Sequence, residues 1–514
     1  MPYDFQFNLQ QKATLSVAIS LLKKNEVKRK IRQLANLDGR LTKAGVERKW
    51  RQIINLVKEL NQHVLPPTLE NELMYFVRKL GEKLYNWYVL IEIENQFPFK
   101  IEEVKDYLDE IYWTPYGTID EVKIFESYLS NNPNRFPKIM YCIACYYALE
   151  EHIDDLWEQM SEDSKKQCDE DIFTNVDRHI WVYWRHWRDG NLPLLKFYFD
   201  TFYMLKEPLT YEYDFSYRID HSPEENMLWM SVHEGDHIAA KYFWGKINER
   251  ERNACIIDCT RMAMMCYDDY EIENKKIKNH KKERYAEICL FLINQMNKDQ
   301  KEFLFNQELS LENVDDFDIM NEDVKSKILV MLLFVWPWQE LFIPVLNDML
   351  PYVKTNSLTL SIMLFESSRK MSHEHKKGCN IKNTTYSSIL QTVWSHLLVT
   401  TKRKMIYSGI SGLVNELLAV QDLESINLIF NDPTIPDLRN QLIESGKRGY
   451  MRLISNNQYA FLNQFIERVL ISDKEKDDFK KKVIEWKGII EGEQLDVAEE
   501  LHNLWPPENA TSSK

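Results

Sequence analysis

The chain has 514 residues, of which 44% are hydrophobic and 28% are charged, and its net charge at pH 7 is −14. This apolar content excludes a disordered protein, because enough surface can be buried to offset the entropy lost on folding. Only 14 Gly and 17 Pro residues are present, fewer than a chain of short strands and frequent turns would need, so the composition favours an all-α protein.

The sequence also carries an expectation about location. Residues Met1 to Gln10 lack the cationic start and apolar run of a secretory signal. No apolar stretch reaches the ~18 residues at which a membrane span is expected, since the most apolar segment, Ile328 to Trp338, is interrupted at Pro337. The eight Cys residues are irregularly spaced, as is typical of reduced thiols. We therefore expect a cytoplasmic protein without a transmembrane segment.

Residues 1–96 are predicted to form an N-terminal helical region that begins with a basic hairpin. Apolar residues from Leu15 to Leu34 mark the stripe of one helix, and those from Val46 to Leu60 mark a second, with Gly39 suited to the turn between them. The first 60 residues contain 13 Lys and Arg against five Asp and Glu, although the chain as a whole is acidic. The basic run Lys23 to Lys30 lies on the first helix. This hairpin could bind an anionic membrane or a nucleic acid.

The rest of the chain is predicted to be one long helical array. A helix is expected over Asn71 to Tyr88, and residues 97–118, with Pro98, Pro115 and Gly117, are interpreted as a connecting segment. The array then spans residues 119–504, and residues 505–514 form a flexible tail. Further helical stretches are predicted in the array over residues 285–303, 328–350 and 387–407.

Two segments of the array share a pattern at an offset of 45 residues. Residues 184–199 read WRHWRDGNLPLLKFYF, and residues 229–244 read WMSVHEGDHIAAKYFW. The pairs Gly190-Asn191 and Gly235-Asp236 predict a turn between two helices in each copy, because glycine adopts the left-handed conformation and Asn or Asp caps the next helix. Weaker echoes begin at Gln421 and Asn457, at an offset of 36. The pattern predicts a repeat architecture.

A helix, a Gly-Asn or Gly-Asp turn and a second helix such as Leu194 to Phe199 resemble the units of ankyrin repeats. The spacing of 45 differs from the period of about 33 in that family, and the Thr-Pro-Leu-His opening is missing. The resemblance covers residues 170–470 and implies an irregular α-solenoid of helix-turn-helix, ankyrin-like repeats. Such a fold presents an extended surface to protein partners.

The best candidate for catalysis is the sequence His233-Glu234-Gly235-Asp236-His237, which matches H-E-x-x-H. On one continuous helix this spacing would place His233 and His237 on one face as zinc ligands and Glu234 as the general base of a hydrolase. The third ligand would come from elsewhere, with Glu249, Glu251 and Asp258 the nearest carboxylates downstream. The alignment with Gly190-Asn191 favours a turn at Gly235 instead, which would separate the histidines.

Cysteines and histidines elsewhere give weaker candidates for metal or redox sites. Cys142 and Cys145 form a C-x-x-C with His152 nearby, but they lie in an apolar helical segment where cysteine packs as a small hydrophobe. The same interpretation holds for Cys255, Cys259 and Cys266. An incomplete set of possible ligands is formed by His373, His375 and Cys379.

A group of tryptophans and arginines is a candidate for binding single-stranded nucleic acid. Trp181, Trp184 and Trp187 alternate with Arg185 and Arg188, a mixture found on such platforms. A spacing of three residues predicts a buried helical face instead, and the acidic net charge of the chain disfavours binding to phosphates.

We therefore expect a non-catalytic scaffold or adaptor that binds a protein partner through helical repeats, without a cofactor. The sequence leaves two alternatives open. One is a zinc-dependent hydrolase that uses His233, Glu234 and His237. The other is an adaptor that binds an anionic membrane or nucleic acid through the basic hairpin of residues 12–58.

Overall fold

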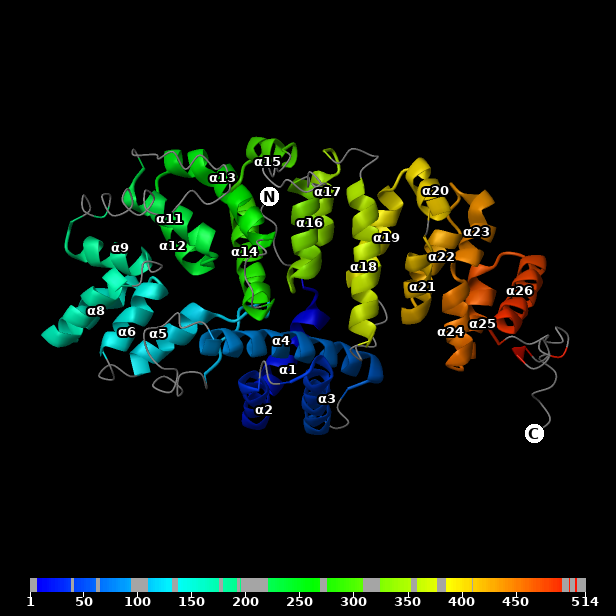
Figure 1. Ribbon diagram of the computed structural model, residues 1–514, viewed down its shortest axis with the longest axis horizontal. Helices are drawn as coiled ribbons and strands as arrows, with labels where there is room; N and C mark the ends of the chain where they lie inside the picture. The colour runs from blue at the N-terminus through cyan, green and yellow to red at the C-terminus, as the bar shows by residue number, and fades with distance from the viewer. Residues whose placement is uncertain are drawn as a thin grey trace. The chain divides into compact units, whose positions relative to one another are not determined.

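A computed structural model describes residues 7–37, 41–61, 65–93, 110–131, 137–174, 179–191, 195, 221–268, 275–307, 324–352, 358–376, 385–408, 410–491, 499, 504 and 505. Over these residues the fold is all-α, as the composition predicts: there is no strand, and extended backbone pairs only in a bridge between Trp113 and Ile119. The chain divides into two compact units, residues 1–341 and 342–514 (Figure 1). This boundary lies inside the span 119–504 that the sequence predicts as one array.

The N-terminal part of unit 1 is built on the long helix α4 (Pro67–Ile93), against which α1 (Leu9–Leu22), α2 (Asn25–Asn36) and α3 (Lys43–Leu60) pack (Figure 1). The prediction of a single helix through Leu15 to Leu34 is wrong, because the chain breaks between α1 and α2 at Lys23 and Lys24. The apolar stripe continues across the break because α1 and α2 each bury their apolar residues against α4. Gly39 and residues 94–109 lie outside the described residues.

The remainder of unit 1 is a succession of helices in which chain neighbours pack in pairs. The pairs are α6 with α7, α11 with α12, and α13 with α14, and a row of contacts also runs through α6, α9, α11, α13 and α16. Helix α14 returns to contact α4. The bounds are α5 (Glu121–Asn131), α6 (Pro137–Tyr146), α7 (Glu150–Gln159), α8 (Glu162–Thr174), α9 (His179–Arg188), α11 (Pro223–Glu234), α12 (His237–Lys246), α13 (Glu249–Asp268), α14 (Lys275–Gln295), α15 (Lys298–Phe305), α16 (Val324–Phe334) and the 3-10 turn η3 (Trp338–Leu341).

Unit 2 repeats this pairing in a more regular way. Helices α18, α21, α24 and α26 are successive neighbours in one row, and α19, α22 and α25 are neighbours in a second. The aromatic ring of Tyr450 lies at the centre of its core, against Phe465 and Phe479. The bounds are α17 (Phe342–Met349), α18 (Leu358–Lys376), α19 (Thr385–His396), α20 (Val399–Ser408), α21 (Ser411–Val420), α22 (Leu423–Phe430), η4 (Pro436–Leu438), α23 (Arg439–Ser445), α24 (Lys447–Ser455), α25 (Tyr459–Val469) and α26 (Asp473–Glu491).

The three further stretches predicted to be helical are helical, and each contains a break. In the stretch 285–303, helix α14 ends at Gln295 and α15 begins at Lys298. The side chain of Asn297 caps α15 and forms a capping box with Gln300. The second is broken near Pro337, which lacks the backbone N–H that an α-helix needs. The third is broken at Leu397, between α19 and α20. None of the described helices has the length and apolarity needed to cross a membrane.

A single type of turn recurs through both units. The residue after the helix takes a left-handed backbone at Ala148, Gly190, Gly235, Gln421 and Asn457, with φ between 52° and 75°. At each turn the N–H of the following residue donates to the carbonyl five residues earlier, over 2.8 to 3.1 Å. This is the Schellman arrangement that satisfies the last carbonyls of a helix. Five of the described helices therefore end in the same way, which is compatible with a helical-repeat fold.

Candidate functional site

The H-E-x-x-H sequence lies across one of these turns. Helix α11 ends at Glu234, Gly235 has a φ of 75°, and α12 begins at His237. The Asp236 carboxylate caps α12, where it accepts hydrogen bonds from the N–H groups of Ile238 at 3.2 Å and Ala239 at 3.1 Å. His233 and His237 therefore belong to different helices. The continuous helix that the zinc interpretation requires is not formed here.

The described residues also hold no cluster of three His, Cys, Asp or Glu side chains with the geometry of a metal site. The carboxylates of Glu249, Glu251 and Asp258 lie on α13 and do not complete a ligand set with the histidines. His373 and His375 fall in α18, but their side chains and Cys379 lie outside what the structure describes.

Helix α12, which follows the turn at Gly235, instead forms part of the wall of a pocket of about 630 Å³ in unit 1. Its walls come from the segment between Thr114 and Glu126, from the turn between α6 and α7, from α12 and from α14. Among the described residues, six carboxylates line it, against a single lysine, Lys241. These are Asp120, Glu121, Glu126, Glu150, Glu151 and Glu287. We call this the central pocket.

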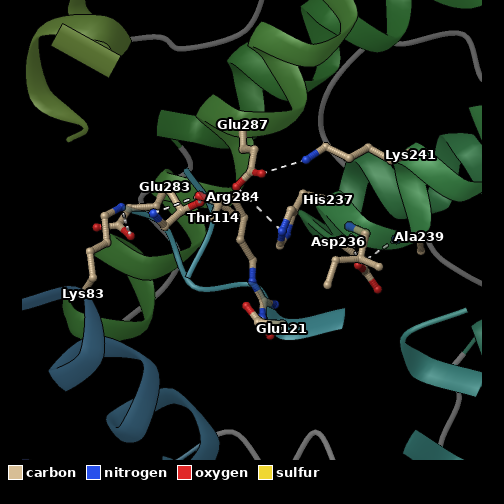
Figure 2. A network of polar contacts seen from close by, with 12 residues as sticks. Lys83, Thr114, Glu121, Asp236, His237, Ala239, Lys241, Glu283, Arg284 and Glu287 are labelled. Carbon is tan, nitrogen blue, oxygen red and sulfur yellow. Dashed lines mark hydrogen bonds and ion pairs between the residues drawn. The ribbon is translucent and has the colours of Figure 1, made fainter. Parts of the chain in front are cut away.

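A buried acidic cluster lies at one wall of the central pocket. The Glu121 side chain, 7% exposed, accepts a hydrogen bond of 3.0 Å from the hydroxyl of Tyr147, and its carboxylate lies 3.7 Å from the Arg284 guanidinium. Burial raises the pKa of Glu121, although Arg284 and Tyr147 oppose the shift. Burial also raises the pKa of Asp236, again against the attraction of Arg284. Arg284 of α14 thus pairs with Glu121 (Figure 2), and its positive charge also attracts the Asp236 carboxylate.

A second cluster joins α12 to α14. Glu287 pairs with the Lys241 ammonium at 2.7 Å, and its other oxygen lies 3.7 Å from Nε2 of His237 (Figure 2). Burial lowers the pKa of His237 to about 3, so the imidazole is neutral near pH 7. Burial opposes ionisation of Glu287, but His237, Lys241 and Lys83 outweigh it and lower the pKa of Glu287 to about 2. Nδ1 of His237 is buried with no hydrogen-bond partner among the described residues.

Other charges at the pocket differ in how firmly they are held. Glu150 accepts hydrogen bonds from the Tyr242 hydroxyl at 2.7 Å and from Lys246 at 2.6 Å. Glu126 and Glu151 have no Lys or Arg partner within the described part of the chain. Burial favours the neutral form of Glu150, yet its bonds to Lys246 and Tyr242 lower its pKa. The pocket therefore combines fixed ion pairs with carboxylates, such as those of Glu126 and Glu151, that no described Lys or Arg compensates.

Most of the cysteine and tryptophan candidates are part of the core, whereas Cys266 and Trp187 are only partly buried. Cys142, Cys145, Cys255 and Cys259 are buried thiols. Trp184 is fully buried, and its indole N–H donates to the carbonyl of Cys145 at 2.8 Å. Arg188 stacks on the ring of Trp157, 3.4 Å from its centroid. These contacts tie α9 to α6 and α7, so the described side chains do not form an open stacking surface.

Comparisons with known proteins do not assign the chain to a family. No family model, no curated protein and no solved structure matches the chain. The ankyrin-like resemblance therefore rests on the repeated turn alone. The chain is an all-helical protein whose helices pack in neighbouring pairs.

Proposed function

We propose that the chain is a non-catalytic scaffold of ankyrin-like helical repeats, an irregular α-solenoid, that binds a protein partner. In this proposal the central pocket receives a cationic segment of the partner, such as an exposed loop or helix end with Lys or Arg side chains. The paired packing of helices supports the scaffold, because stacked helix pairs bury a continuous core and leave an extended surface for binding.

The excess of carboxylates in the central pocket carries the proposal. Glu126 and Glu151 have no Lys or Arg partner within the described chain, so a Lys or Arg from outside would meet negative charge that the protein's own Lys and Arg side chains do not neutralise. The clusters at Glu121 and Glu287 are already paired, which keeps the walls rigid and reduces the ordering cost of binding. A buried Nδ1 of His237 without a partner also supports a ligand site, since buried polar atoms are normally satisfied.

Site-specific crosslinking in the full-length chain tests the proposal. A photoreactive amino acid replaces Glu126 in the pocket, and in a control it replaces Glu302, an exposed residue of α15. We expect a protein to crosslink from position 126 and not from position 302. The crosslinked peptide of that protein should contain Lys or Arg.

Charge reversal then separates binding in the pocket from adhesion to an acidic surface. Affinity for the captured protein should fall at least tenfold in the variant Glu126→Lys/Glu151→Lys. It should stay unchanged in the control variant Glu158→Lys, because Glu158 is an exposed residue of α7 outside the pocket. Equal affinity of the wild type and the pocket double variant would refute the proposal.

A further inference from the structure

A second cavity lies in unit 1 between α2 and α3 and has the opposite charge to the central pocket. Its volume is about 330 Å³. Lys30 and Lys49 lie on its two sides, and the amides of Gln33, Asn36 and Gln52 complete its polar lining. Among the residues that the structure describes, no carboxylate lines it. We call this the α2–α3 groove.

The groove lies within a surface whose positive charge is not neutralised by the protein. Five further basic residues, on α2, on α3 and just before α2, have exposed side chains: Lys23, Lys24, Arg29, Arg48 and Arg51. Neither these side chains nor Lys30 and Lys49 form an ion pair with any residue that the structure describes. Glu47, the acidic residue of α3 nearest to them in sequence, is held 2.8 Å from Arg78 of α4. These positive charges repel one another, and this repulsion favours the binding of an external anion.

The chemistry of the lining fits phosphate groups. Two ammonium groups supply charge without the fixed bidentate geometry of arginine, and side-chain amides donate further hydrogen bonds to phosphate oxygens. The volume is at the lower end of the range for small-molecule sites, about 300 to 1,000 Å³. A compact ligand with several phosphates therefore suits the groove better than a polymer.

The burial of Trp50, an aromatic residue of α3, argues against binding of nucleic acid at the α2–α3 groove. Binding of single strands relies on exposed aromatic rings on which bases stack. Trp50 of α3 is 2% exposed and lies beneath the guanidinium of Arg78, 4.7 Å from its ring centroid. The lining of the groove contains no aromatic side chain. The basic residues around the groove instead suit the anionic surface of a bilayer, since such clusters bind acidic lipids.

We infer that the α2–α3 groove binds the multiply phosphorylated headgroup of an anionic lipid, with Lys30 and Lys49 as its principal contacts. The surrounding basic residues add attraction to the membrane surface. This site does not depend on the acidic central pocket, so a failure of either proposal leaves the other standing.

Vesicle flotation with the full-length chain tests the inference. The probes are phosphatidylcholine vesicles that contain phosphatidylinositol 4,5-bisphosphate, and vesicles of equal surface charge made with phosphatidylserine. We expect at least tenfold tighter binding to the bisphosphate vesicles, and competition by soluble inositol 1,4,5-trisphosphate. Equal binding to both kinds of vesicle would overturn the inference, because it would show that the basic surface attracts anionic lipids without a specific headgroup site.

Two variants of equal charge change make the test specific. Lys30→Gln/Lys49→Gln should lose at least tenfold in affinity for the bisphosphate vesicles, whereas Lys298→Gln/Lys404→Gln, at exposed lysines outside the groove, should bind as the wild type does. Circular dichroism checks that each variant folds. Unchanged binding by the groove variant overturns the inference, as does binding of the free trisphosphate without binding of vesicles, or tighter binding to a single-stranded RNA than to the bisphosphate vesicles.

Discussion

The hydroxyl of Tyr285 donates a hydrogen bond of 2.7 Å to the backbone carbonyl oxygen of His233 in the last turn of α11. This contact satisfies a carbonyl that has no partner within its own helix end. It also brings the Tyr285 ring over the turn, so that a Cβ atom on Gly235 would lie 3.0 Å from the ring. The turn that separates His233 from His237 is thus held both by its own backbone and by α14.

Substitution of the two repeat glycines should have unequal effects. Gly190 and Gly235 share a left-handed backbone, with φ of 64° and 75°, but a Cβ on Gly190 would meet nothing within 4 Å. Gly190→Ala should lower the free energy of unfolding by about 1 kcal/mol from backbone strain alone. Gly235→Ala should lower it by about 2 to 3 kcal/mol, because overpacking against Tyr285 adds to the strain. Urea unfolding of both variants measures the difference.

Asparagine provides the control for this comparison. Asn457 already occupies the left-handed position of the equivalent turn in unit 2, with a φ of 54°. Gly190→Asn should therefore cost less than Gly190→Ala. If Gly235→Ala were no more destabilising than Gly190→Ala, Tyr285 would not pack on the turn as described.

Residues with strong backbone preferences made parts of this architecture predictable. Glycine followed by Asn or Asp marks a helix end at Gly190 and Gly235, and the weaker echo from Gln421 to Asn457 has the same turn in unit 2. The turn at Ala148 has the same hydrogen bonds, but alanine gives no sequence signal for a left-handed backbone. The break at Lys23 and Lys24 could not be predicted, because the helical spacing of apolar residues continues through it.

The central pocket could not be predicted, since its charges come from distant parts of the chain. Glu121, Asp236 and Arg284 each read as an ordinary charge at a helix end or surface, and only the fold brings them together. Partial signals exist in hindsight. His237 and Lys241 are four residues apart and meet the same carboxylate, and Glu287 interrupts an apolar stretch of α14.

Breaking a buried ion pair in unit 2 should strongly lower the free energy of unfolding. Lys402 Nζ lies 2.8 Å from Asp432 Oδ2, with side chains 7% and 6% exposed, and the indole N–H of Trp394 donates to the same oxygen. Asp432→Asn should cost about 3 kcal/mol of unfolding free energy, because it leaves the Lys402 ammonium buried without its counter-charge. The double variant Lys402→Met/Asp432→Asn should recover part of the loss. A double variant less stable than Asp432→Asn would contradict this account.

The buried thiols should resist alkylation in the folded protein. Burial raises the pKa of Cys289 to about 12, and the pKa of Cys142 is also raised, first by its contact with Cys168 and then by burial. Because the thiolate is the reactive form, iodoacetamide at pH 8 should leave both unmodified until denaturant is added. Cys266 is only partly buried and should react earlier. Mass spectrometry of tryptic peptides measures the order, and rapid labelling of Cys142 in the native chain would instead indicate a reactive C-x-x-C.

Acid should destabilise unit 1 through His237. Its pKa is lowered from 6.5 to about 3 by burial, so between these values the unfolded chain binds a proton on this residue that the folded chain does not. The unfolding free energy should therefore fall as the pH falls from about 6.5 towards 3, by at most about 1.4 kcal/mol per pH unit from this residue. Glu287, with its pKa lowered from 4.5 to about 2, adds a loss in the same direction below about pH 4.5.

The variant His237→Gln isolates this contribution because glutamine does not titrate. Its unfolding free energy should fall less between pH 7.5 and pH 5.5 than that of the wild type. In NMR spectra of the chain labelled at histidine, the signal that disappears in His237→Gln should keep one chemical shift from pH 8 to pH 5. A titration of that signal with a midpoint near 6.5 would show that His237 is solvated and would remove the rigid wall from the central pocket.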